Sequence, residues 1–171
     1  MLAHIFIYIF LSLYLDSLGY SKTVIGLLWA LSVAIEVLWF FTQGRWLPRL
    51  SLPGWLVLAG AVMAFRMALT AGVPTLWPVL LLAQALHAIT FAAHHSVCIA
   101  WITHHFPGRL RGRGQALYSV LGYGLPGVLG GLLGGLLSSR FGLASVFWLS
   151  GACALVAMAC AWRLRESPAG H

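Results

Sequence analysis

Charged residues are scarce in this chain of 171 amino acids, and acidic residues are almost absent. Only 8% of the residues are charged, and Asp and Glu together number three, against ten Lys and Arg. A soluble domain carries about 25% charged residues. Hydrophobic residues make up 61% of the chain and the mean hydropathy is +0.92. The composition therefore excludes an ordinary soluble protein and predicts an integral membrane protein.

Cysteine is also sparse, and its placement favours neither disulfides nor a metal site. Cys98, Cys153 and Cys160 all lie inside apolar segments, where cysteine behaves as a small hydrophobic residue. The chain contains no CxxC or HExxH motif, and His94 with Cys98 is the one ligand pair at the i,i+4 spacing of a helix. We therefore predict neither a resident metal nor a cofactor.

In place of charge, the chain has six apolar segments. A helix needs roughly 20 residues to cross a bilayer, and the last five segments are long enough. The first has fifteen residues, which rise only ~22 Å as a helix. The sequence therefore predicts an all-α, polytopic helix bundle in a lipid bilayer, with a truncated first helix. The segments are residues 1–15, 23–42, 53–71, 76–103, 115–137 and 144–162.

The basic residues are distributed unevenly between the two ends of these segments. Lys22 and Arg140 lie on one side, and seven arginines follow the second, fourth and sixth segments. Loops rich in Lys and Arg stay in the cytoplasm, so we predict a plasma (inner) membrane protein with a cytoplasmic C-terminus. The net charge of +7 is then an orientation signal, and we predict no nucleic-acid partner. The seven are Arg45, Arg49, Arg109, Arg111, Arg113, Arg163 and Arg165.

Three ionisable side chains lie at a similar depth inside the apolar segments. At ~1.5 Å per residue, His4, Glu36 and His87 are ~18, ~21 and ~16 Å from the non-cytoplasmic side, near the middle of a ~30 Å core. Charges at that depth cost several kcal/mol and usually serve function. We predict proton-coupling roles for Glu36, His87 and His4. The alternative for Glu36 is a structural hydrogen bond to a neighbouring helix, and for His4 and His87 it is a hydrogen-bonded interior histidine without a proton-coupling role.

The fourth segment carries a polar stripe on an otherwise apolar helix. Its members recur at steps of three and four residues, which places them on one helical face directed at protein or a water-filled cavity. Gln84 and Arg66 lie ~12 and ~8 Å deep, above the level of Glu36, so a direct Arg66–Glu36 pair would be strained. Tyr8 is expected to line the same cavity. The stripe is Gln84, His87, Phe91, His94, Cys98, Trp101 and His105.

Several stretches of the chain resemble a known transporter family. The sequence is similar to the C-terminal six-helix half of a major facilitator superfamily transporter, in the proton-linked branch that contains lactose permease and 3-phenylpropionate permease. The Leu-His pair of the fourth segment and the Arg/Gly loop after it are fairly specific to this branch. The matching stretches are LYLDSLGYS (13–21), IGLLW (25–29), Glu36-Val37, QALH (84–87) with Phe91, and FPGRLRGRGQALYS (106–119).

The resemblance implies alternating access at the interface of two six-helix halves. It implies proton-coupled symport of a small organic acid, aromatic or sugar-like solute. His87 matches the coupling histidine of lactose permease and Arg66 resembles its arginine. Thr90 and Gln84 depart from its acidic and basic residues, which favours an organic acid over lactose. The solute-binding candidates are Arg66, Gln84, His94 and Tyr8.

The resemblance covers one half of such a transporter. The expected partners are a missing N-terminal half or a second copy of the chain, besides the solute and protons. We expect no enzymatic activity. Two alternatives stay open: a non-transporting remnant that acts as a scaffold, and a membrane redox protein with a haem held between His4 and His87.

Overall fold

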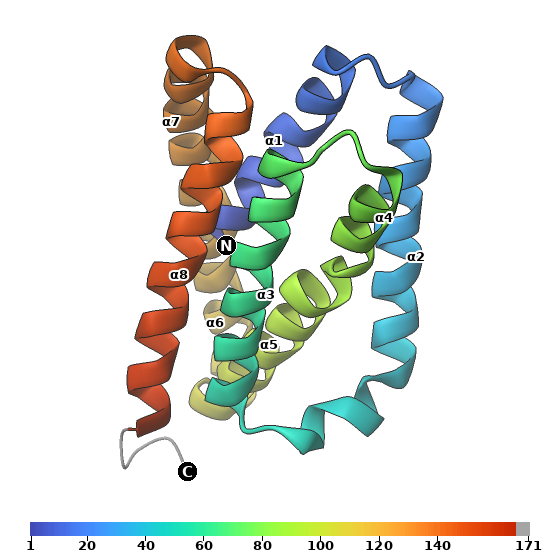
Figure 1. Cartoon of the computed structure of the whole chain (residues 1–171). Helices are drawn as coiled ribbons and strands as arrows, with labels where there is room; N and C mark the ends of the chain where they lie inside the picture. The colour runs from blue at the N-terminus through green and yellow to red at the C-terminus, as the bar shows by residue number, and fades with distance from the viewer. Residues whose placement is uncertain (167–171) are drawn as a thin grey trace.

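The computed structural model describes residues 1–166, with side chains described to Leu164, and every regular element in that range is a helix. This confirms the all-α membrane bundle (Figure 1). Arg165, counted above as an orientation signal, lies outside the described side chains. The elements are α1 (Leu2–Ser17), α2 (Lys22–Trp46), η1 (Leu47–Arg49), α3 (Leu52–Gly72), α4 (Trp77–Ala85), η2 (Ala88–Ala93), α5 (His94–His105), η3 (Gly108–Leu110), α6 (Arg111–Ser119), η4 (Val120–Gly124), α7 (Leu125–Phe141) and α8 (Ala144–Glu166).

Five helical stretches in the described part of the chain are long and apolar enough to cross a membrane. They are residues 22–49, 52–72, 77–105, 108–141 and 144–164, and α1 is a shorter apolar helix. These agree with the six apolar segments read from the sequence. Some observed stretches extend beyond the predicted segments: residues 22–49 extend beyond 23–42, and residues 108–141 extend beyond 115–137 at both ends.

Local signals explain where the helices begin and end. Ser21 and Ser51 cap α2 and α3 by accepting hydrogen bonds from the backbone N–H groups of Val24 and Gly54. Gly142, with φ of 80°, separates α7 from α8. This left-handed conformation suits glycine, which has no Cβ to clash.

The fourth span is not one continuous α-helix, contrary to the stripe predicted from its sequence. α4 ends at Ala85, and the π-helical segment η2 precedes α5. A π-helical turn has more residues than an α-helical turn, so the polar stripe changes register there. His95 continues the line of His87 and Phe91, whereas His94 points to a different neighbourhood. A second π-helical segment, η4, interrupts the fifth span just before α7.

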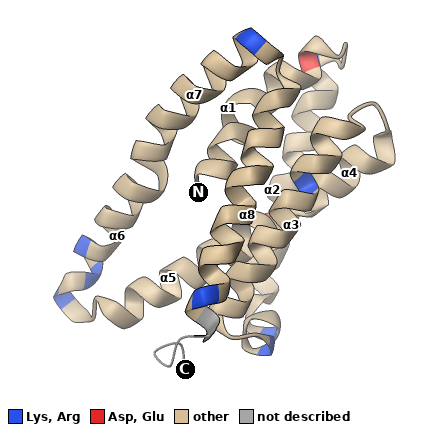
Figure 2. Cartoon of the chain, turned by 60° about the vertical axis from the view of Figure 1, so that its left-hand side comes forward, with Lys and Arg blue, Asp and Glu red and all other residues tan. Residues whose placement is uncertain are grey.

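α3 and α8 lie side by side and pack closely, and α1 lies against α7 and α8 (Figures 1 and 2). A glycine permits one close approach, because a Cβ added at Gly60 would lie 2.8 Å from Cβ of Met158. α1 begins halfway along the bundle (Figure 1). Beside its first residue lies a cavity of about 250 Å³, lined mainly by α1, α3 and α8.

The charged residues gather at the ends of the helices (Figure 2). Most of the basic ones lie at the end of the bundle where α5 turns into α6 and where α8 ends. Among the basic residues Arg66 is the exception, because it lies inside α3 and is only 1% exposed. A buried guanidinium requires partners of its own, and these partners define the candidate site.

Replacing Gly60 with valine should destabilise the bundle by about 1–3 kcal/mol, because the new side chain overpacks the contact between α3 and α8. Gly135→Val is the matched control, since a Cβ at Gly135 meets nothing within 4 Å. The thermal unfolding midpoint in detergent measures the difference. Equal losses in the two variants would contradict close packing at Gly60.

Candidate functional site

The buried guanidinium of Arg66 donates hydrogen bonds to three side chains of the fourth span. Its Nη1 lies 3.2 Å from Nδ1 of His87 and 3.1 Å from Oγ1 of Thr90, and its Nη2 lies 3.2 Å from Oε1 of Gln84. All four residues are at most 2% exposed. Nε of Arg66 is buried without a hydrogen-bond partner among the described residues. The site therefore contains one spare donor.

The bond from Arg66 determines which nitrogen of His87 carries a proton. Arginine donates and does not accept, so Nδ1 of His87 accepts and the neutral ring carries its proton on Nε2. That nitrogen lies 3.2 Å from Oε2 of Glu36, and the Nε2–H group donates to the carboxylate. Arg66, His87 and Glu36 thus form a directed relay across α3, the fourth span and α2.

Glu36 is the exposed end of this relay. Its side chain is 21% exposed, whereas that of His87 is 3% exposed. The carboxylate therefore lies at the border between the buried network and the open face of α2. A proton that reaches Glu36 from that face stays on the carboxyl group, because Nε2 of His87 already carries a proton and Nδ1 accepts from Arg66.

Gln84 joins the second helix to the same network. Its Oε1 accepts from Arg66 and also from the hydroxyl of Ser32, at 2.8 Å. Ser32 is fully buried on α2, one helical turn before Glu36. Spacing alone could have identified Ser32, because residues four apart share a helical face. Ser32 was not among the predicted site residues.

His4 and Tyr8 of α1 form the aromatic border of the relay. The His4 ring lies 5.7 Å from the His87 ring and 5.5 Å from that of Phe91. Tyr8 stacks on Trp29 at 6.0 Å and is 37% exposed. Nε2 of His4 is buried and without a partner among the described residues. α1 therefore supplies ring contacts to the site and no carboxylate.

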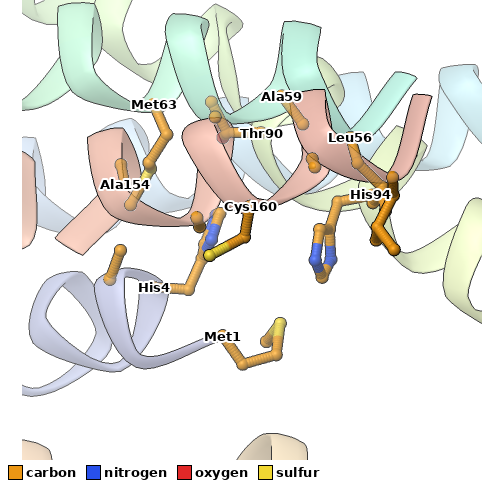
Figure 3. A pocket seen from close by; sticks show the side chains of 14 residues that line it. Met1, His4, Leu56, Ala59, Met63, Thr90, His94, Ala154 and Cys160 are labelled. Carbon is orange, nitrogen blue, oxygen red and sulfur yellow. The ribbon is translucent and has the colours of Figure 1, made fainter. Parts of the chain in front are cut away.

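His94 lies apart from the Glu36–His87 pair. It lines the cavity beside the start of α1 together with His4, Met1 and Cys160 (Figure 3). Its Nε2 lies 3.7 Å from Sγ of Cys98. The structure thus brings together six of the seven predicted site residues and leaves His94 on the far side of His4.

Arg66 and Gln84 were expected above the level of Glu36, and both hydrogen-bond within the network of His87. The long arginine side chain and the oblique course of the fourth span (Figure 1) bring these groups together. No direct Arg66–Glu36 bond forms among the described side chains, because His87 lies between them.

The space around His4 and His87 does not suit a haem. Their rings contact each other edge to face, and the ring of Phe91 stacks on His87 at 5.1 Å. Tyr8 fills the adjoining side, at 5.9 Å from His4 and 6.4 Å from His87. A porphyrin would need to lie between the two imidazoles, so the residues present do not fit the haem alternative.

The comparisons with known proteins agree with this architecture. The chain matches the MFS_1-like family over residues 1–149. It is 31% identical over 156 residues to a protein of Escherichia coli (strain K12) named "Probable 3-phenylpropionic acid transporter". That alignment covers 91% of this chain and 40% of the relative, so the chain spans less than half of the relative's length. No solved structure is significantly similar. The chain therefore belongs to the MFS_1-like family of multi-pass membrane transporters in the major facilitator superfamily.

Proposed function

We propose that this chain forms one half of a proton-coupled symporter for a small organic acid. The observation that carries the proposal is the buried relay of Glu36, His87 and Arg66. In one network the relay combines Glu36, which can gain and lose a proton, with the fixed positive charge of Arg66. An aromatic or a sugar-like solute is the alternative to an organic acid.

The charge balance of the relay explains how proton and anion binding would be coupled. With Glu36 ionised, His87 neutral and Arg66 charged, the network has no net charge. A proton added to Glu36 leaves one positive charge in a medium of low dielectric constant, which is unfavourable. A bound carboxylate restores neutrality. Proton and anion therefore favour each other's binding, which is the thermodynamic basis of symport.

The side chains around the relay support an organic acid with an apolar or aromatic body. Arg66 and Gln84 provide polar contacts for a carboxylate, and the Arg66 Nε–H group has no partner among the described residues. Tyr8, Trp29 and Phe91 form an aromatic border beside it. The Escherichia coli relative is named for an aromatic acid. Aromatic rings favour stacked or edge-to-face partners.

The second wall of the transport pathway would come from another six-helix half. Transport sites of this superfamily lie at the interface between repeats, and this chain covers 40% of its relative. A separate N-terminal half or a second copy of the chain is the proposed partner. We place both in the plasma (inner) membrane, with the C-terminus of this chain in the cytoplasm, because the basic residues concentrate at one end of the bundle.

Cysteine labelling tests this orientation. In a background in which Cys98, Cys153 and Cys160 are replaced by serine, Gly112→Cys should react with an impermeant maleimide only after the cytoplasmic face is exposed. Thr75→Cys should react in intact cells, because the α3–α4 connection lies at the opposite end. Both positions are exposed. The reverse labelling pattern would invert the proposed topology.

Glu36→Gln should abolish uphill uptake, because the amide cannot carry the coupled proton. Proteoliposomes that contain the chain and its partner half, under an imposed pH gradient, measure accumulation. The variant should reach only passive equilibration and lose its response to the gradient, while solute exchange persists. Asp16→Asn, at a carboxylate exposed near the end of α1, should accumulate solute as the unsubstituted protein does. Unchanged accumulation by Glu36→Gln would remove it from the coupling mechanism, and no flux in any form would favour the scaffold alternative.

Arg66→Lys should raise KM for a carboxylate solute about tenfold or more, because lysine is a point charge that cannot replace the guanidinium fork. KM for a neutral amide analogue of the same solute should change much less. Arg109→Lys, at an exposed loop position, is the control and should change neither value. Equal effects on acid and amide would show that Arg66 acts only on the structure of the site.

A further inference from the structure

A second histidine of the fourth span lies in a cluster of aromatic rings outside the relay. His95, in the first turn of α5, is packed between Phe91, at 5.8 Å and 19°, and Phe40 of α2, at 6.3 Å and 81°. Tyr118 and Tyr123 of the fifth span complete the cluster. The cluster therefore draws on three different spans.

A column of stacked rings connects this cluster to the relay. His87 stacks on Phe91 with an interplanar angle of 9°, and Phe91 stacks on His95 with an angle of 19°. The three residues are four apart, and the π-helical segment η2 lies between the two histidines. A π-helical turn brings residues four apart closer to alignment than an α-helical turn does. η2 thus places both imidazoles in one column.

His95 connects the fourth span to the fifth through one nitrogen. Its Nδ1 lies 3.4 Å from the hydroxyl of Tyr118 and 3.3 Å from that of Tyr123. An unprotonated Nδ1 has one lone pair and accepts one of these O–H groups at a time. Once Nδ1 is protonated it becomes a donor, and the hydroxyls must turn to accept. The direction of this contact between spans therefore depends on the protonation of His95.

We propose that His95, with its neutral ring protonated on Nε2, is a further proton-accepting residue, and that protonation of Nδ1 reverses the hydrogen bonds that join the fourth span to Tyr118 and Tyr123 of the fifth. As a role in transport this rests on the proposed function, whereas the reversal of the contact does not. η2 ends two residues before His95 and η4 contains Tyr123, and π-helical segments are frequent at functional sites. The contact thus couples proton uptake to the packing of two interrupted spans.

The ionisable groups around His95 are few. Among the described side chains, no Asp, Glu, Lys or Arg forms an ion pair or hydrogen bond with it. On its own helix, His94 is its neighbour, and Cys98 interacts with Tyr118. α2 carries Glu36 one turn before Phe40, and α3 carries Arg66, which is bound to His87 at the other end of the column. A change in the protonation of His95 therefore acts mainly on the hydroxyl groups of Tyr118 and Tyr123.

Nuclear magnetic resonance of the tyrosine-labelled chain in lipid nanodiscs tests the reversal. The ring signals of Tyr118 and Tyr123, assigned with Tyr118→Phe and Tyr123→Phe, should shift together as the pH is lowered. The shift should disappear in His95→Phe, which keeps a ring in the column and removes both nitrogens. It should persist in His104→Phe, because His104 is exposed near the end of α5. The proposal would be overturned if the tyrosine signals did not shift with pH, or if they shifted equally in His95→Phe.

A reciprocal measurement keeps the test valid if His95→Phe does not fold. In the chain labelled with ¹⁵N-histidine, the double variant Tyr118→Phe/Tyr123→Phe should alter the Nδ1 signal of His95 and leave that of His104 unchanged. An unaltered His95 signal contradicts the contact. In uptake assays, His95→Phe should change the pH profile of transport. Failure of uphill uptake in every form, with the tyrosine response intact, would overturn the symport proposal and leave the His95 contact standing.

Discussion

The buried guanidinium of Arg66 is the constraint on which the centre of the bundle depends. A charge so far from water is tolerated only where hydrogen-bond acceptors surround it, and all three of its acceptors come from the fourth span. Two of these acceptors also form hydrogen bonds to α2: Gln84 with Ser32, and His87 with Glu36. One side chain thus sets the relative positions of three spans, and the same bonds define the tautomer of His87. The hydrogen bonds that position these spans are therefore the same bonds that fix the proton of His87.

The rest of the bundle is held by close packing of small residues. In lipid, apolar side chains gain little by leaving their surroundings, so helices associate through van der Waals contact and interhelical hydrogen bonds. The approach of α3 to α8 at Gly60 is of this kind, and Ser150 adds a bond to the backbone of α1, at 2.8 Å from the carbonyl oxygen of Ala3. The polar network therefore lies within a tightly packed frame.

Much of the fold and part of the site were predictable from the sequence, and the exceptions have a common cause. Hydropathy predicted the membrane helices, and counting residues brought His4, Glu36 and His87 to one level. Both inferences assume regular α-helices. The register shift at η2 breaks that assumption, so the sequence favoured His94 and overlooked His95.

The position of Met1 determines what can be joined to the front of this polypeptide. Its side chain borders an internal cavity beside His4 and Cys160, and α1 starts at mid-height in the bundle (Figures 1 and 3). An affinity tag attached there would begin beside this cavity, between the two ends of the bundle. A polyhistidine or acidic tag would place polar groups inside the apolar interior, at several kcal/mol for each charge. An apolar helical spacer of about ten residues, ~15 Å long, is the kind of fusion that this geometry accommodates.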